Sequence, residues 1–239
     1  MIIRLFQKGF NYSQDGPGNR LVLHLAGCSM QCPWCSNPEG KSHTAGTAVT
    51  VDAVVQEAVS CKPMFFDGGG VTLTGGEVTE QFDAVKQLLA KLKENGITTC
   101  IETNGTHPRL PELFDLVDHL IMDCKHYDAQ QHRSVLGFPL QTVRENLQKA
   151  AKRQVAVRIP LIGGYNASLE DAKNFAALFT ELGLQTATIE LLPYHEYGKD
   201  KYEKLGLTYP MTEEAKVAPA QVRAFSDILR QSGMTIIKT

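Results

Sequence analysis

Short apolar runs alternate with longer amphipathic segments along most of the chain. Six runs rich in Val, Ile, Leu and Thr predict strands, at residues 21–25, 71–74, 97–101, 119–122, 155–160 and 188–192. Apolar residues that recur every three or four positions predict the intervening helices, at residues 50–60, 82–92, 111–116, 140–153, 169–182 and 219–232. Regular alternation of strands and helices is typical of βα units around a parallel sheet.

Six such strands predict an α/β fold, and specifically an incomplete (β/α)6 TIM-like barrel. The chain has 239 residues and 43% hydrophobic content, and α/β barrels commonly reach this length undivided. We therefore expect residues 1–239 to form a single domain.

The net charge bears on which partners the protein can bind, and the length of its apolar runs bears on its cellular compartment. The formal net charge is −2, from 24 basic and 26 acidic residues that are interspersed, which argues against nucleic acid or an anionic membrane as partner. Residues 1–8 lack the apolar stretch of a signal peptide, and no later run is long enough to span a bilayer. We expect a cytoplasmic protein, in which cysteines serve as metal ligands or buried thiols rather than disulfides.

Three cysteines stand within eight residues of the segment 27–38, namely Cys28, Cys32 and Cys35. Thiolates hold zinc or iron–sulfur clusters, and a closed structural site normally needs four protein ligands. Cys61, Cys100 and Cys124 are isolated and are expected to be buried thiols. The non-catalytic alternatives for the triplet are three buried thiols or a zinc knuckle that lacks one ligand. A [4Fe-4S] cluster on three cysteines instead leaves one iron open for chemistry.

Polar or glycine-rich residues follow several predicted strands. In α/β barrels the reactive groups gather at the carboxyl ends of the strands, so these residues are expected on one face. They are the cysteine triplet, Gly75-Gly76-Glu77, Glu102-Thr103-Asn104, Asp123 with Lys125, and His195.

The triplet, with Trp34 at the aromatic position, resembles the signature of the radical S-adenosylmethionine (SAM) enzymes. Its flanks are similar to those of glycyl radical enzyme activating enzymes of the pyruvate formate-lyase type, in residues 15–20, 35–40 and 191–199. The resemblance runs from about Asp15 to about Leu205. It implies a [4Fe-4S] cluster that reductively cleaves SAM, and a 5′-deoxyadenosyl radical that takes a hydrogen atom from a glycine of a large partner enzyme.

The resemblance also assigns roles around SAM. Gly75, Gly76 and Glu77 would bind its amino group, although a strand-to-helix turn with Glu77 in the first helical turn is the simpler alternative. Lys125 would pair with the SAM carboxylate, and Glu102 with Asp123 would hold a monovalent cation or ribose hydroxyls. The family usually has Asp where this chain has Glu102. Trp34 and Asn104 complete the expected cofactor-binding set.

Three further sites carry an alternative beside the functional interpretation. Arg158 lies in an apolar strand, where a cation needs a ligand or a carboxylate such as Glu190. His195 resembles a residue near the SAM ribose, or it is a surface or capping histidine. The turn that contains Asp15, Gly16 and Gly18 is expected from the resemblance to shape the site near the target peptide.

The expected partners are a glycyl radical enzyme as protein substrate and flavodoxin or ferredoxin as electron donor. Only a short polar linker joins Cys35 to the helix near Thr50, so no ferredoxin-like insert with a second cluster is expected. A six-stranded barrel stays laterally open, which predicts a cleft at the carboxyl ends bordered by residues 15–18, the Cys28 loop and residues 163–166. A radical SAM enzyme acting on a small molecule is the alternative.

Overall fold

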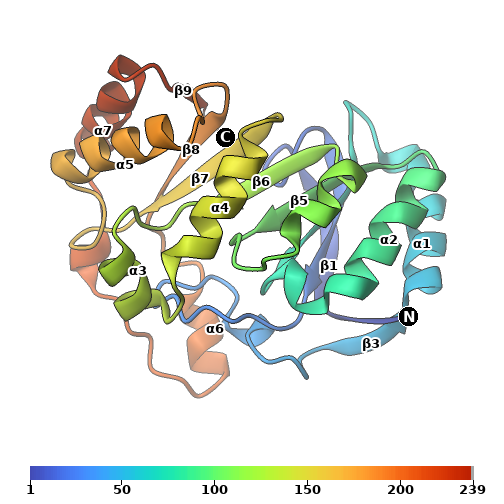
Figure 1. Ribbon diagram of the computed structural model, residues 1–239. Helices are drawn as coiled ribbons and strands as arrows, with labels where there is room; N and C mark the ends of the chain where they lie inside the picture. The colour runs from blue at the N-terminus through green and yellow to red at the C-terminus, as the bar shows by residue number, and fades with distance from the viewer. Residues whose placement is uncertain (238–239) are drawn as a thin grey trace. The chain divides into compact units, whose positions relative to one another are not determined.

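The computed structural model describes residues 1–237, which pack as two compact units (Figure 1). The first unit comprises Met1–Ser29, Asn37–Thr103 and Arg109–Ile121, and the second comprises Met30–Ser36, Asn104–Pro108 and the chain from Met122 onward. Each unit is described by itself. The assignment of the whole chain to a single domain stays a prediction.

The described residues contain nine strands in the order β3-β1-β2-β4-β5-β6-β7-β8-β9, so the sheet is not closed into a barrel. The six predicted strands are all present, and the α/β class and the incomplete barrel are confirmed. Their observed bounds are β2 Asn19–Leu25, β4 Gly70–Gly75, β5 Thr98–Thr103, β6 His119–Asp123, β7 Val155–Leu161 and β8 Thr188–Pro193.

Three strands lie outside the predicted set: β1 Ile2–Tyr12, β3 Thr47–Thr50 and β9 Thr235–Ile237. β1 pairs antiparallel with β2 and β3, and much of its side-chain surface is exposed. Its sequence mixes charged and apolar residues, so it lacks the continuous apolar run that identifies a strand buried in a parallel sheet.

The first unit is built on parallel strands covered by helices. β2 runs parallel to β4 and β4 to β5, which places Leu23 beside Leu73 and Leu73 beside Ile101. α1 Val51–Ser60 and α2 Phe82–Glu94 lie side by side on this unit (Figure 1). The predicted apolar face of α2 is buried, at Phe82, Val85, Leu88, Leu89 and Leu92. Burial of this face, rather than intrinsic propensity, accounts for most of a helix's stability in a protein.

Local signals fix where α1 begins. Thr50 accepts a hydrogen bond from the Ala53 backbone N–H at 3.1 Å and so caps the helix, which starts at Val51 rather than at Thr50. The unit also contains four 3₁₀ helices: η1 Pro38–Gly40, η2 Lys62–Met64, η3 Val78–Gln81 and η4 Leu110–Leu116.

The second unit contains the parallel strands β7, β8 and β9. α5 Leu169–Glu181 and α7 Pro219–Gln231 lie beside each other, and Phe175 packs against Phe225 with ring centroids 6.1 Å apart (Figure 1). A capping box between Ser168 and Asp171 begins α5. The remaining elements are α3 Ala129–Leu136, α4 Leu140–Ala150, α6 Lys199–Lys204 and the 3₁₀ helix η5 Glu213–Ala215.

The sequence pattern did not predict α3 or α6, since α3 buries only His132 and Leu136 and α6 buries only Tyr202. The predicted helix 140–153 ends earlier, at Ala150. Within residues 1–237, no helix combines the length and the apolar character needed to cross a membrane.

Candidate active site

The cysteine loop begins where β2 ends, and backbone hydrogen bonds hold its first residues in the first unit. The Gly27 N–H donates to Gly40 O at 2.8 Å, and the Cys28 N–H donates to Lys41 O at 3.2 Å. Gly27 O in turn accepts from the Glu77 N–H at 2.7 Å. The protein chain itself therefore fixes the backbone at Cys28.

The rest of the loop belongs to the second unit. The Cys35 N–H donates to Cys32 O at 3.3 Å, and the Gln31 N–H donates to Leu136 O at 3.0 Å. Cys28, Cys32 and Cys35 are all half-buried, and none of them forms a disulfide. Within residues 1–237 no three His, Cys, Asp or Glu side chains already form a metal-binding group, so the three-cysteine cluster site stays a prediction.

The glycines of Gly75-Gly76-Glu77 bring β4 against other backbone. A Cβ built on Gly76 would lie 2.2 Å from Gly27 O, and one on Gly75 would lie 2.4 Å from the Leu25 N. Only glycine fits such an approach. Gly75 thus admits the backbone of β2, and Gly76 admits the start of the cysteine loop; the role of these glycines toward SAM stays a prediction.

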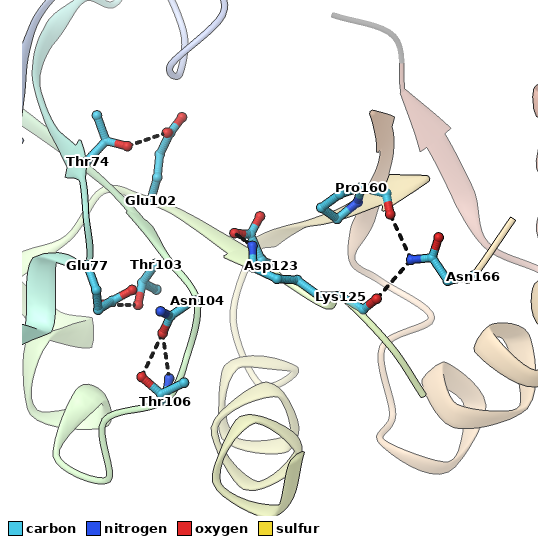
Figure 2. Close-up of polar contacts among 10 residues, drawn as sticks. All are labelled: Thr74, Glu77, Glu102, Thr103, Asn104, Thr106, Asp123, Lys125, Pro160 and Asn166. Carbon is cyan, nitrogen blue, oxygen red and sulfur yellow. Dashed lines mark hydrogen bonds and ion pairs between the residues drawn. The ribbon is translucent and has the colours of Figure 1, made fainter. Parts of the chain in front are cut away.

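The Glu77 side chain is 1% exposed and accepts three hydrogen bonds at Oε1. The donors are the Thr79 N–H at 3.0 Å and the Thr79 hydroxyl at 2.6 Å. The third donor is the Thr103 hydroxyl at 2.7 Å (Figure 2). Glu77 thus caps the 3₁₀ helix η3, close to the simpler alternative of a first-turn carboxylate. Its role toward the SAM amino group stays a prediction.

Hydrogen bonds from threonines hold the side chains of Glu102, at the end of β5, and of Asn104, just after it. Glu102 Oε2 accepts from the Thr74 hydroxyl at 2.7 Å in the first unit. Asn104 Oδ1, in the second unit, accepts from the Thr106 N–H at 3.1 Å and from the Thr106 hydroxyl at 2.7 Å, as Figure 2 also shows. No role was predicted for Thr103, although it stands between two predicted site residues.

Lys125 forms an ion pair with Asp123 in the second unit (Figure 2). The Lys125 side chain is only 12% exposed, and its backbone O accepts from Asn166 Nδ2 at 2.8 Å. The same Nδ2 donates to Pro160 O at 2.8 Å, which ties the Lys125 backbone to β7. Asp123 and Lys125, predicted as neighbours in one site, are therefore in direct contact.

Arg158 and His195 were predicted to bind the cofactor, and each makes the contact that its alternative interpretation describes. Arg158 Nε lies 2.6 Å from Glu190 Oε2, and both side chains are nearly buried. The ion pair follows from register, because Arg158 and Glu190 are opposite each other on β7 and β8. His195 is exposed, stacks on Tyr197 with ring centroids 4.0 Å apart, and accepts the Tyr197 N–H at Nδ1.

The loop that contains Asp15, Gly16 and Gly18 lies at the amino ends of β2 and β4, not at their carboxyl ends. It connects β1 to β2, and Asp15 O accepts from the hydroxyl of Thr72 at 2.6 Å. The fully buried Arg20 holds the loop, with Nη1 3.2 Å from Pro17 O and Nη2 2.8 Å from Val71 O. The expected border on a carboxyl-end cleft is therefore wrong for this loop, because β2 runs away from it toward Cys28.

Aromatic side chains support the second half of the cysteine loop. The rings of Trp34 and Tyr165 are 5.1 Å apart, and a Cβ on Gly198 would lie 2.5 Å from Cys35 O. Tyr202 of α6 is 5% exposed; burial and the nearby Cys35 and Cys32 thiols raise its pKa to about 12. No contact with the cysteine loop was predicted for Tyr165 or Tyr202, although residues 163–166, which contain Tyr165, were predicted to border the cleft.

The three isolated cysteines differ in burial. Cys100 and Cys124 are fully buried as predicted, and burial raises the pKa of Cys124 to about 12. Cys61 is half-buried at the C-terminal end of α1, so the prediction of a buried thiol is wrong there. Cys61 has no strand neighbours, since the chain turns directly from α1 into a short 3₁₀ helix.

Comparison with known proteins agrees with this geometry. The model of the radical SAM superfamily matches residues 22–179. Pyruvate formate-lyase 2-activating enzyme of Escherichia coli (strain K12) is 33% identical over 271 residues, which cover 98% of this chain and 92% of that protein. Pyruvate formate-lyase-activating enzyme of Staphylococcus aureus (strain USA300) is 34% identical over 211 residues, which cover 83% of this chain and 84% of that protein.

Solved structures show the same fold. A crystal structure of a domain of pyruvate-formate lyase-activating enzyme from Bacteroides vulgatus matches with a TM-score of 0.59 and 25% identity, covering 72% of this chain and 99% of that one. Streptococcus suis SuiB bound to precursor peptide SuiA matches with a TM-score of 0.68 and 16% identity, over 92% of this chain and 48% of that one. From these matches, the chain belongs to the radical SAM superfamily, among the pyruvate formate-lyase-activating enzymes.

Proposed function

We propose that this protein is an activating enzyme that cleaves SAM reductively and installs a glycyl radical on a partner glycyl radical enzyme. One observation carries the proposal: three half-buried cysteines outside any disulfide follow a parallel strand in a chain that is 33% identical to an activating enzyme over 98% of its length. Soft thiolates in this spacing suit an iron–sulfur cluster.

The cluster would be a [4Fe-4S] cluster on Cys28, Cys32 and Cys35. The donor set fits it, since three thiols can supply three ligands and leave one iron for SAM. Backbone contacts at Gly27 and Cys35 hold the loop around these thiols. The chemistry that the bound cluster supplies is one-electron cleavage of SAM to methionine and a 5′-deoxyadenosyl radical, which takes a hydrogen atom from a glycine of the partner.

The protein's own groups would bind and orient SAM. In this proposal Lys125 binds the SAM carboxylate, and its ion-pair partner Asp123 holds the ammonium in place. Glu77 and the backbone of Gly75 and Gly76 face the amino group. The other expected contacts come from Trp34, Glu102, Asn104, Arg158 and His195, and Glu102 and Asp123 supply carboxylates for a monovalent cation.

The partner and the electron donor complete the proposal. The substrate is a glycyl radical enzyme. Flavodoxin or ferredoxin supplies the electron directly, in the cytoplasm. The match to the Escherichia coli relative runs over 271 positions, more than the 239 residues here, so that relative has residues within the matched region that this chain lacks. This supports a chain without a ferredoxin-like insert.

The test uses anaerobically reconstituted protein, a chemical reductant, SAM and a candidate glycyl radical enzyme. The expected result is 5′-deoxyadenosine together with a glycyl-radical electron spin resonance signal on the partner. SAM cleavage with no radical on any glycyl radical enzyme, but with turnover of a small molecule, would favour the small-substrate alternative. Stoichiometric zinc in place of iron would refute the enzyme altogether.

A further inference from the structure

The hydroxyl of Tyr165 is a buried polar group that the proposed chemistry does not use. Tyr165 follows β7 in the second unit, and its hydroxyl is fully buried with no hydrogen-bond partner among residues 1–237. Buried hydroxyls nearly always have a partner, because an unsatisfied one costs about 1–3 kcal/mol. This hydroxyl is therefore a candidate donor to something that the bound protein contains.

Neighbours within the same unit fix the direction of the ring. Trp34 packs against it on one side, with ring centroids 5.1 Å apart, and His126 packs at 4.6 Å. His126 Nε2 also lies 3.2 Å from Tyr165 O, while His126 Nδ1 accepts the Asp128 N–H at 2.9 Å. These contacts leave the ring little freedom to turn its hydroxyl elsewhere.

The ring of Tyr165 packs against the loop that carries the predicted cluster ligands. Trp34 stands between Cys32 and Cys35, so the packed rings lie against the cysteine loop. Burial raises the pKa of Tyr165 well above its ordinary value, and the Cys32 thiol beside it raises that pKa further. A phenol O–H can donate a hydrogen bond to a thiolate sulfur.

We propose that the Tyr165 hydroxyl donates a hydrogen bond to the sulfur of Cys32 when the cluster is bound, which makes Tyr165 a positioning residue for the cluster. The inference rests on the proposed function. Hydrogen bonds to cluster sulfurs are among the factors that set reduction potential. Reduction adds a negative charge to the cluster, so a donor at Cys32 favours the reduced form and raises the potential. Tyr165 would in this way ease the electron transfer that precedes SAM cleavage.

The test compares Tyr165→Phe with a matched variant, Tyr127→Phe. Tyr127 belongs to the same group of rings, at 4.6 Å from His126, but its hydroxyl donates to Asp171 Oδ1 at 2.7 Å. Each protein is reconstituted anaerobically, its iron and sulfide are counted, and its cluster is titrated by potentiometry with electron spin resonance detection. We expect equal cluster content, a more negative potential for Tyr165→Phe, and the wild-type potential for Tyr127→Phe.

A second variant covers the case in which Tyr165→Phe fails to hold a cluster. Site-specific replacement of Tyr165 by 3-fluorotyrosine keeps the ring and the hydroxyl but makes the phenol a stronger donor, so the potential should move in the positive direction. Equal potentials in wild type and both Tyr165 variants would overturn the inference, as would the same shift in Tyr127→Phe. A wild type that assembles no cluster at all would overturn the proposed function itself.

Discussion

Replacement of Gly76 by Ala tests the contact that seats the start of the cysteine loop. A Cβ at this position would lie 2.2 Å from Gly27 O and 2.8 Å from Gly40 O. Both atoms are backbone, and both take part in the hydrogen bonds that hold the loop, so neither can move away as a side chain would. The added methyl group must push the end of β4 away from the loop.

The expected cost follows from two terms. Overpacking of a well-packed site costs about 1–3 kcal/mol. Separation of the Glu77 N–H from Gly27 O, now 2.7 Å apart, loses a backbone hydrogen bond worth about 0.5–1.5 kcal/mol. The free energy of unfolding should therefore fall by about 2–4 kcal/mol, and a chain of this size loses roughly 2–4 °C of Tm for each kcal/mol.

Gly9→Ala is the matched control, because a Cβ there meets nothing within 4 Å and the residue lies in the exposed part of β1. That change should leave stability the same or raise it by up to about 1 kcal/mol. The measurement is urea unfolding of the apo protein under reducing conditions, followed by iron and sulfide content after reconstitution. Equal stability of the two variants would show that β4 does not press on the loop.

The remaining predictions concern ligands, charges and pH. Alanine at Cys28, Cys32 or Cys35 should abolish the cluster, while alanine at Cys61, Cys100 or Cys124 should leave iron and sulfide unchanged; full loss at one of the latter three would contradict the ligand set. Lys125→Ala should keep the cluster but weaken SAM binding about tenfold to a hundredfold, since charge-assisted hydrogen bonds are worth about 1.5–3 kcal/mol; unchanged affinity in a binding titration would remove Lys125 from the site. Glu190→Gln strips the carboxylate from Arg158, which is 11% exposed, and should lower the free energy of unfolding by about 3–5 kcal/mol; a value within error of wild type in urea unfolding would count against a buried pair. His132 is fully buried, and burial lowers its pKa, so the unfolded chain binds the proton first and stability should fall as pH drops below about 6.5. His132 Nδ1 donates to Phe138 O at 2.7 Å, and His132→Asn can preserve that donor without titrating, so unfolding midpoints of this variant should depend less on pH between 7 and 5.

Periodicity predicted the elements that bury a continuous apolar face. α2 and the six parallel strands were found this way, because their burial is encoded in local spacing. β1 was missed, since one half-exposed antiparallel strand carries no such run. The loop of Asp15 to Gly18 was misplaced for a different reason. It precedes the predicted strand 21–25 and the cysteine loop follows that strand, so chain order already put the two loops at opposite ends, and the expectation taken from the resemblance went against it.

The site residues likewise divide into those that local sequence could identify and those that depend on tertiary contacts. Spacing alone identified the cysteine triplet. The cost of an unpaired cation in an apolar strand suggested the Arg158–Glu190 pair as an alternative, and the register of β7 and β8 in the structure places the two residues opposite each other. The contact of Tyr165 with Trp34 joins residues far apart in the chain, and no local pattern records it. Packing of this kind depends on the tertiary fold, so the buried hydroxyl at Tyr165 became visible only in the structure.

Two glycines from distant motifs show what the family signatures do physically in this chain. Gly76 admits the backbone of Gly27 in the first unit, and Gly198 admits the backbone of Cys35 in the second. Each glycine thus seats one end of the cysteine loop, although neither can ligate a metal. A motif glycine that packs on backbone acts before any cofactor binds, because its contact is complete in the protein alone. The signature residues of this chain therefore divide into ligands and loop-holding residues, and the glycines belong to the second class.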